Sequence, residues 1–196
     1  MRVRSQEMPQ LPELEALRSE LNRIRYRARY RKLLRSTVRT LTVTAAVAIL
    51  AVTLWLPVLR IVGSSMAPSL TEGDILVCIR DRTPEPGELV SFYLGNRLLV
   101  KRCIAGPGQQ VEITEAGQVR VDGELLAEPY LAAAAPGEGD VPLPCVVPEG
   151  QFFCLGDNRE TSVDSRYSAV GFVSREQING RPVLRVCPLG RFGWLE

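Results

Sequence analysis

The segment Gly63-Ser64-Ser65-Met66-Ala67-Pro68-Ser69-Leu70 is a turn of small and hydroxyl-bearing residues around which the rest of the chain is organised. It follows a long uncharged run and precedes a strand-like apolar stretch. Ser65 is a candidate nucleophile, but a serine hydroxyl is a poor nucleophile unless a base takes its proton. The 196-residue chain contains no histidine, so Ser/His/Asp sites, Cys/His sites and HExxH metal sites are all excluded.

Lysine usage points to a different base. The chain has 22 arginines but only two lysines, Lys32 and Lys101. Arginine keeps its proton at any accessible pH, whereas a lysine buried among apolar neighbours can lose it. Lys101 ends the run Leu98-Leu99-Val100, so we expect an apolar environment in which its amine can act as a base. A carboxylate could in principle serve instead, and compositional drift is the competing explanation of the lysine count.

Charge divides the chain into two halves, although the formal net charge is only +2. Residues 1–40 carry eleven Arg or Lys and four Asp or Glu, whereas residues 60–196 carry thirteen and eighteen. Between them, residues 40–59 are uncharged and long enough as a helix to cross a hydrocarbon core of roughly 30 Å. The positive-inside rule then predicts a cytoplasmic segment at residues 1–39, a transmembrane helix at 40–59 and an extracytoplasmic domain at 60–196.

The N-terminal half is also compatible with three other kinds of segment, each of which the sequence disfavours. A cleaved signal peptide is disfavoured because the apolar run is long and begins some forty residues into the chain. The flanking arginines argue against a buried core helix, and no nucleic-acid motif accompanies the basic residues. Apolar residues at 14, 17, 21, 24 and 28 predict a basic amphipathic helix, which either contacts anionic lipid head groups or is a solvated leader.

The chain after residue 70 has the pattern of β structure without an amphipathic helix. Gly95-Asn96 is predicted to close a hairpin, and residues 129–148, rich in Ala, Pro and Gly, are predicted to form a long surface loop. The sequence therefore predicts a mainly β, antiparallel sheet domain. Strand-like runs occur at residues 75–80, 89–94, 97–104, 111–114, 119–121, 124–126 and 151–155.

Five cysteines lie in the predicted extracytoplasmic part. No CxxC or Cys/His spacing indicates zinc. Cys145 and Cys154 are close enough in sequence to be bridged in an oxidising compartment, and this pairing is left open. Cys78 and Cys103 sit in apolar runs and are expected to be buried thiols.

Three blocks in order resemble the bacterial type I signal peptidases, the membrane-bound Ser/Lys endopeptidases that remove leader peptides from exported preproteins. Residues 65–70 resemble the family's SMxPTL, residues 101–109 its KRxxGxPGD, and residues 156–166 its GDNRxxSxDSR. With the preceding span, the resemblance covers roughly residues 40–180. It implies a sheet domain of the signal-peptidase type, preceded by one N-terminal transmembrane helix.

The resemblance also implies a role for each matching residue. Ser65 would attack the scissile carbonyl and Lys101 would be the general base. Ser162 would hydrogen-bond Lys101, and Asp164 with Arg166 would form a supporting ion pair near the site.

The nucleophile turn adds two further expectations. Met66 would contact the substrate, although its alternative interpretation is a simple core residue. The main-chain amide of Ser65 would donate to the oxyanion, but Gly63 stands where some members carry a second, hydroxyl donor. Smaller departures are Ser69, Ala105 and Gln109 in place of threonine, glycine and aspartate.

The expected function is therefore signal-peptide cleavage at the cell membrane by a single-pass enzyme with a cytoplasmic N-terminus. Its partners would be membrane lipid and preproteins with small residues before the cut, with no nucleic acid, no cofactor and no metal. Alternatives are a related Ser/Lys peptidase for a pilin-type or conjugation-type precursor, and an inactive membrane-tethered binding module. A self-cleaving repressor would need a DNA-binding domain where this chain has a span.

Overall fold

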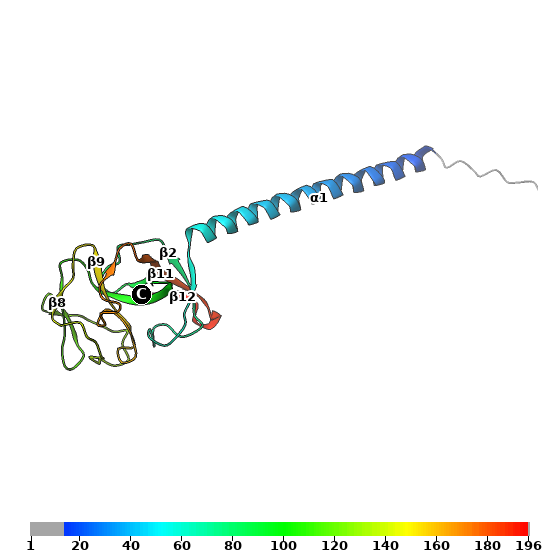
Figure 1. The fold of residues 1–196 in the computed structure, drawn as a ribbon. Helices are drawn as coiled ribbons and strands as arrows, with labels where there is room; N and C mark the ends of the chain where they lie inside the picture. The colour runs from blue at the N-terminus through cyan, green and yellow to red at the C-terminus, as the bar shows by residue number, and fades with distance from the viewer. Residues whose placement is uncertain (1–13, 196) are drawn as a thin grey trace, which may run out of the picture. The chain divides into compact units, whose positions relative to one another are not determined.

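The computed structural model describes residues 14–195, apart from the side chains of residues 14–16 and 51–55 (Figure 1). The chain forms two compact units, Met1–Ala51 and Val52–Glu196. Residues 1–13 of the predicted cytoplasmic segment lie outside the described part. The two units are described separately below.

The first unit contains most of the long helix α1, Leu14–Trp55, whose last four residues belong to the second unit. It begins where the three-four spacing of apolar residues begins, so the predicted amphipathic helix and the predicted span are one continuous helix. Its stretch Leu17–Leu50 is long and apolar enough to cross a membrane. The predicted end at Leu59 is wrong: Pro57 lacks an amide hydrogen and disfavours helical geometry in the residue before it, so the helix stops at Trp55.

The second unit is built on two antiparallel sheets, as predicted. The larger sheet has the strand order β1-β2-β11-β3-β4-β9-β10, and β12 also pairs with β11. The smaller sheet has the order β7-β6-β5-β8. The strands of the larger sheet are β1 (Val58–Arg60), β2 (Ile75–Ile79), β3 (Leu89–Leu94), β4 (Arg97–Ala105), β9 (Gln151–Leu155), β10 (Val173–Ser174), β11 (Ile178–Cys187) and β12 (Gly193–Trp194). Those of the smaller sheet are β5 (Gln110–Ile113), β6 (Val119–Val121), β7 (Glu124–Leu125) and β8 (Cys145–Val146), and the 3-10 helix η1 is Leu189–Arg191.

The predicted hairpin is formed by β3 and β4, which pair from Leu89↔Arg102 to Leu94↔Arg97. No sequence pattern predicts β11, the ten-residue strand between β2 and β3 at the middle of the larger sheet. Gly180 and Pro182 interrupt its apolar alternation, and its pairing with β2 shifts register after Pro182. A proline in a strand argues against a central position unless a bulge accommodates it.

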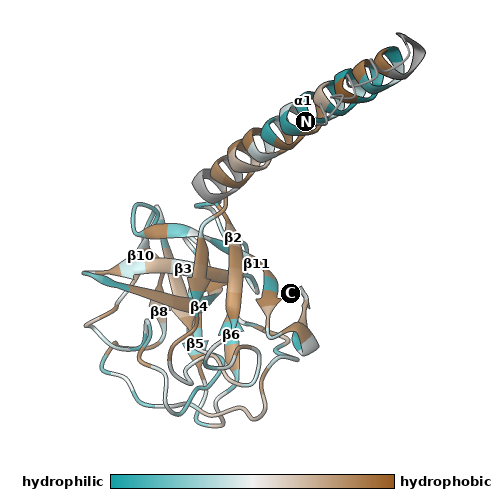
Figure 2. Cartoon of the chain, turned by 90° about the vertical axis from the view of Figure 1, so that its right-hand side faces the viewer, coloured by the Kyte–Doolittle hydropathy of each residue, from teal (hydrophilic) through white to brown (hydrophobic). Residues whose placement is uncertain are grey.

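Three groups of buried apolar side chains fill the second unit, and apolar residues follow the strands of the larger sheet (Figure 2). Met66 and Leu70 of the nucleophile turn, residues 63–70, belong to the same core cluster as Leu76 and Cys78 on β2. This packing fixes the turn to the sheet. Among the described residues all five cysteines are free thiols, and Cys78 and Cys103 are buried as expected.

Candidate active site

The nucleophile turn is anchored at both ends. Backbone hydrogen bonds join Ile61 to Asp74 at 2.8 Å and Gly73 to Ile61 at 3.0 Å, and Met66 and Leu70 are buried beneath it. Gly63 has φ +89°, a conformation that residues with a side chain rarely adopt, although a Cβ there would meet nothing within 4 Å. The backbone conformation, rather than a lack of space, therefore favours glycine at this position.

The structure brings the two predicted reacting residues together. Lys101 on β4 places its Nζ 2.8 Å from Ser65 Oγ and 2.9 Å from Ser162 Oγ. Only 3% of Lys101 is exposed. The amine therefore lies between two hydroxyl groups that come from distant parts of the chain, and Ser162 restricts where the amine can point.

Burial dominates the electrostatics of this amine. Removal from water disfavours the ammonium form and lowers the pKa of Lys101 to about 8. The Asp164 carboxylate opposes this shift, whereas the Arg166 guanidinium adds to it. A lysine with such a pKa is partly neutral near physiological pH and can accept a proton from a hydroxyl 2.8 Å away.

The predicted Asp164–Arg166 ion pair is present and buried. Arg166 Nε lies 2.8 Å from Asp164 Oδ1, and Nη2 lies 2.9 Å from Oδ2, so the contact is bidentate. The carboxylate also accepts a hydrogen bond from the Gly156 amide at 2.9 Å. Arg166 donates in turn to the carbonyl of Arg159 at 2.9 Å. This pair therefore organises the segment 156–166 that carries Ser162.

At Gly156 this segment and the nucleophile turn lie close together. A Cβ on Gly156 would lie 2.1 Å from Ser162 Oγ and 2.5 Å from the carbonyl oxygen of Ser65. Next to it, the Asn158 amide donates to that same Ser65 carbonyl at 3.1 Å. Only glycine allows the two segments to hold Ser65 and Ser162 on either side of the lysine.

Arg102, on the opposite face of β4 from Lys101, makes a second buried ion pair that the sequence did not reveal. Its Nε and Nη2 lie 3.0 and 2.8 Å from the Asp157 carboxylate. Its guanidinium also stacks 3.8 Å from the Tyr130 ring. These contacts fix the start of the segment 156–166 to the strand that carries Lys101.

A second interaction that the sequence did not reveal holds the nucleophile turn to β11. Arg185 Nη2 donates to the Ser69 carbonyl at 2.5 Å, and its Nε lies 3.2 Å from the buried Asp74 carboxylate. Arg191 donates to the Thr71 hydroxyl at 2.7 Å. No sequence motif predicts this contact, because the sequence does not indicate β11 itself.

A pocket of about 270 Å³, lined mainly by apolar residues, lies beside Ser65. Its walls are residues 58–62 and 98–100, and Ser65 and Met66 lie between them. Met66 is 2% exposed, so it belongs to the core as well as to the pocket lining. β1 pairs only with β2, and residues 98–100 of β4 pair only with β3, within the described part of the chain. Strand edges capable of further pairing therefore flank the pocket.

The described residues include no group of three or more His, Cys, Asp or Glu side chains placed to hold a metal ion.

Comparison with known proteins gives consistent matches. A family model described as signal peptidase, peptidase S26, matches residues 34–187. A probable signal peptidase I-2 of Synechocystis is 39% identical over 145 residues, covering 68% of this chain and 64% of that protein. The match thus spans just under two thirds of the length of that relative. Signal peptidase IB of Staphylococcus aureus is 34% identical over 150 residues, which are 66% of this chain and 77% of that protein.

A solved structure, a signal peptidase I from Enterococcus faecalis, also matches. It is 30% identical, with a TM-score of 0.42, and the match covers 50% of this chain and 96% of that one.

Proposed function

Because the chain belongs to the signal peptidase family, peptidase S26, we propose that it is a membrane-anchored serine endopeptidase that removes N-terminal signal peptides from exported preproteins. Its nucleophile is Ser65 and its general base is Lys101. The observation that carries this proposal is the buried amine of Lys101, 2.8 Å from the Ser65 hydroxyl and with a pKa lowered to about 8.

The reaction begins with the neutral amine of Lys101. It takes the hydroxyl proton as Ser65 Oγ attacks the scissile carbonyl, and the main-chain amide of Ser65 donates to the developing oxyanion. The lysine ammonium then gives its proton to the leaving amine as the scissile bond breaks. The part of the substrate before the cut remains bound to Ser65 Oγ as an acyl group. Lys101 next takes a proton from water, the hydroxide attacks the acyl carbonyl, and Ser65 regains its proton. Ser162 keeps the amine aligned throughout.

The substrate segment before the cut would bind as an added strand. The pocket beside Ser65 is flanked by β1 and by residues 98–100 of β4, each of which pairs, among the described residues, with another strand along one edge only, so the other edge can hydrogen-bond an extended peptide. Most of its lining residues are apolar, and Met66 lies next to Ser65 in the lining. A pocket of about 270 Å³ shared by several substrate residues favours small apolar side chains next to the scissile bond.

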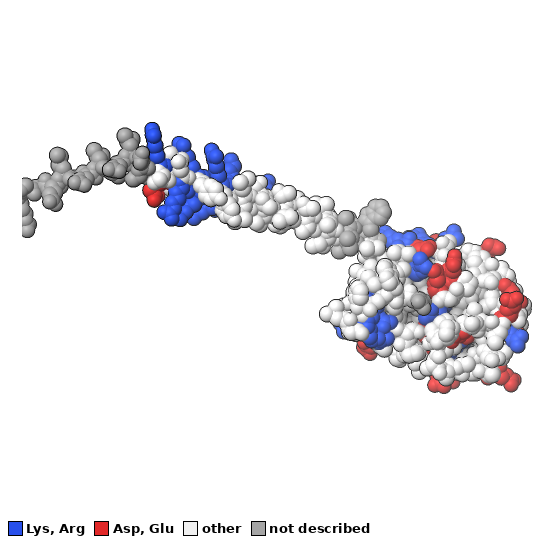
Figure 3. Space-filling view, turned by 180° about the vertical axis from the view of Figure 1, so that it is seen from behind, with Lys and Arg blue, Asp and Glu red and all other residues white. Residues whose placement is uncertain are grey.

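Helix α1 supports the membrane anchor. Its Lys and Arg residues gather on the N-terminal part of the helix, and the remainder is uncharged (Figure 3). Four threonine hydroxyls, at residues 37, 40, 42 and 44, donate to carbonyls one turn earlier, which satisfies them without water. The basic part would lie against anionic lipid on the cytoplasmic side, with the sheet unit outside the membrane.

Cleavage of a preprotein by the purified full-length protein tests the proposal. We expect one cut, after a small-x-small motif, which Lys101→Met abolishes. Lys32→Met is the matched control, because it removes the other lysine of the chain and should leave the rate unchanged. Binding of the preprotein without cleavage would favour the tethered binding module, and cleavage only of a pilin-type precursor would favour the specialised peptidase.

Accessibility of the sheet unit to added protease in intact cells tests the topology. Degradation of residues 60–196 without cell lysis supports an extracytoplasmic unit, and protection until lysis contradicts it.

A further inference from the structure

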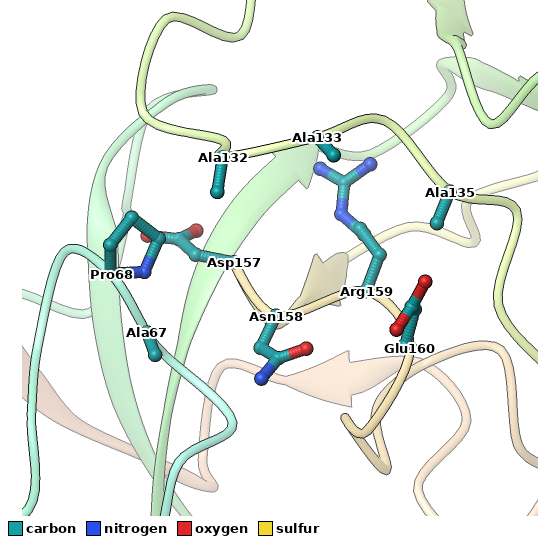
Figure 4. A pocket seen from close by; sticks show the side chains of 9 residues that line it. All are labelled: Ala67, Pro68, Ala132, Ala133, Ala135, Asp157, Asn158, Arg159 and Glu160. Carbon is teal, nitrogen blue, oxygen red and sulfur yellow. The ribbon is translucent and has the colours of Figure 1, made fainter.

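A second pocket, of about 290 Å³, is lined by the part of the nucleophile turn that follows Ser65 and Met66. Three segments line it: Ala67 and Pro68 of the turn, the alanines Ala132, Ala133 and Ala135, and residues 157–160 (Figure 4). Neither the proposed reaction nor the strand-edge binding of the signal peptide uses this pocket.

The position of this pocket relative to Ser65 suggests its role. Ser65 and Met66 line the first pocket, whereas the next two residues of the same turn line the second. Asn158, in the wall of the second pocket, donates its amide to the Ser65 carbonyl at 3.1 Å. A polypeptide that fills the first pocket and crosses Ser65 is therefore directed towards the second pocket beyond the cut.

The loop that closes the second pocket is held in place by polar contacts. Arg159 forms a buried ion pair with Glu128 at the start of this loop. The Arg166 guanidinium donates a hydrogen bond to the Pro136 carbonyl at 2.7 Å. The main-chain carbonyl of Arg166 accepts a hydrogen bond from the Asp140 amide at 3.0 Å. These contacts keep the alanine run close to residues 157–160 before any ligand binds, so binding does not have to order the loop.

The charges around the pocket do not cancel. Asp157 is paired with Arg102, and Arg159 is paired with Glu128. Glu160 lies at the exposed rim and has no hydrogen bond or ion pair to another described residue. The opposite walls consist of alanine and proline. The pocket therefore combines an apolar surface with one uncompensated negative charge.

We propose that the second pocket binds the first residues after the scissile bond, and that Glu160 makes it favour basic or neutral side chains over acidic ones. This proposal rests on the proposed peptidase function, because it assigns the primed side of that same site. The occupant is the N-terminal end of the mature protein, in extended conformation.

Filling the pocket tests its occupancy. Ala133→Trp places an indole in the pocket, and Ala134→Trp is the matched control, because Ala134 is an exposed neighbour that does not line it. Two peptides share the residues before the cut, but one continues for six or so residues and the other ends in a small amide leaving group. We expect Ala133→Trp to lower kcat/KM about tenfold for the long peptide and to leave the short one unchanged.

The outcomes separate this proposal from the one on which it rests. If Ala133→Trp changes both peptides equally, or neither, the pocket does not bind the residues after the cut. If the unmodified protein cleaves neither peptide and no preprotein, the peptidase function itself fails, and this assignment fails with it.

The charge preference is tested with long peptides that carry Lys, Gln or Glu in the positions just after the cut. We expect kcat/KM to be about two- to fivefold higher for Lys than for Glu at low salt, a size typical of exposed charge pairs. Glu160→Gln should remove this ratio, and Glu149→Gln, an exposed carboxylate outside both pockets, should keep it. A ratio that survives Glu160→Gln overturns the role of Glu160.

Discussion

The rate of cleavage should follow the deprotonation of Lys101. With a pKa of about 8, the neutral amine makes up about 1% of the population at pH 6, about half at pH 8 and about 90% at pH 9. We therefore expect kcat/KM to rise about tenfold per pH unit at low pH, about ninetyfold between pH 6 and pH 9, and then to level off. A lysine at its ordinary pKa of 10.5 would give a rise that continues past pH 10.

The assay uses the full-length protein in detergent and a peptide without ionisable side chains, at constant ionic strength. Circular dichroism at each pH confirms that the fold persists, and Lys32→Met, the variant of the other lysine, should give the same curve. A rate that stays flat between about pH 6 and pH 8, with chemistry limiting, would refute a lysine base. A rate that keeps rising above about pH 10 would refute the burial argument.

Three other changes have defined outcomes. Asp164→Asn removes a charge that raises the pKa of Lys101, so the rising limb of the pH–rate curve should move to lower pH. Gly156→Ala places a Cβ 2.1 Å from Ser162 Oγ and should lower kcat about a hundredfold in the peptide assay, whereas Gly106→Ala, whose Cβ has 3.8 Å of space, should not. Lys101→Met should raise the unfolding temperature in detergent at about pH 7. The protonated buried amine destabilises the folded state by up to about 3 kcal/mol at that pH, and the hydrogen bonds that the variant loses offset part of the gain. The pKa of Lys101 is lower in the folded protein than in the unfolded one, so the gain in unfolding temperature should vanish as the pH rises through about 10.5. A gain that does not depend on pH would contradict the assignment.

The sequence predicted the fold where local pattern decides it. The β3–β4 hairpin follows from two apolar runs around Gly95-Asn96, and the antiparallel sheet class is confirmed. β11 could not be predicted, because Gly180 and Pro182 break its alternation and only its neighbours β2 and β3 keep it extended. The predicted end of the helix at Leu59 is wrong because it rests on the uncharged run, which continues to Leu59. Pro57 ends the helical geometry earlier, at Trp55, and the charge pattern does not show this.

The candidate site was predictable to the extent that residue chemistry restricts it. A chain without histidine and with one lysine beyond residue 32 left few partners for Ser65, and three short motifs led to the family that the comparisons confirm. The roles of Ser65 and Lys101 stay predictions, which their 2.8 Å separation supports. The role of Arg185 could not be predicted, because its contact with the Ser69 carbonyl joins residues 116 positions apart and depends on where β11 lies.

Covalent labelling tests the central claim, that Lys101 activates Ser65, most directly. The full-length protein is incubated with a slowly hydrolysed acylating peptide ester, and intact mass and peptide mapping locate the acyl group. We predict one acyl group per chain, on Ser65, with a labelling rate that falls at least a hundredfold in Lys101→Met and is unchanged in Lys32→Met. An acyl group on another residue, or labelling of Lys101→Met at the rate of the unmodified protein, would contradict the account.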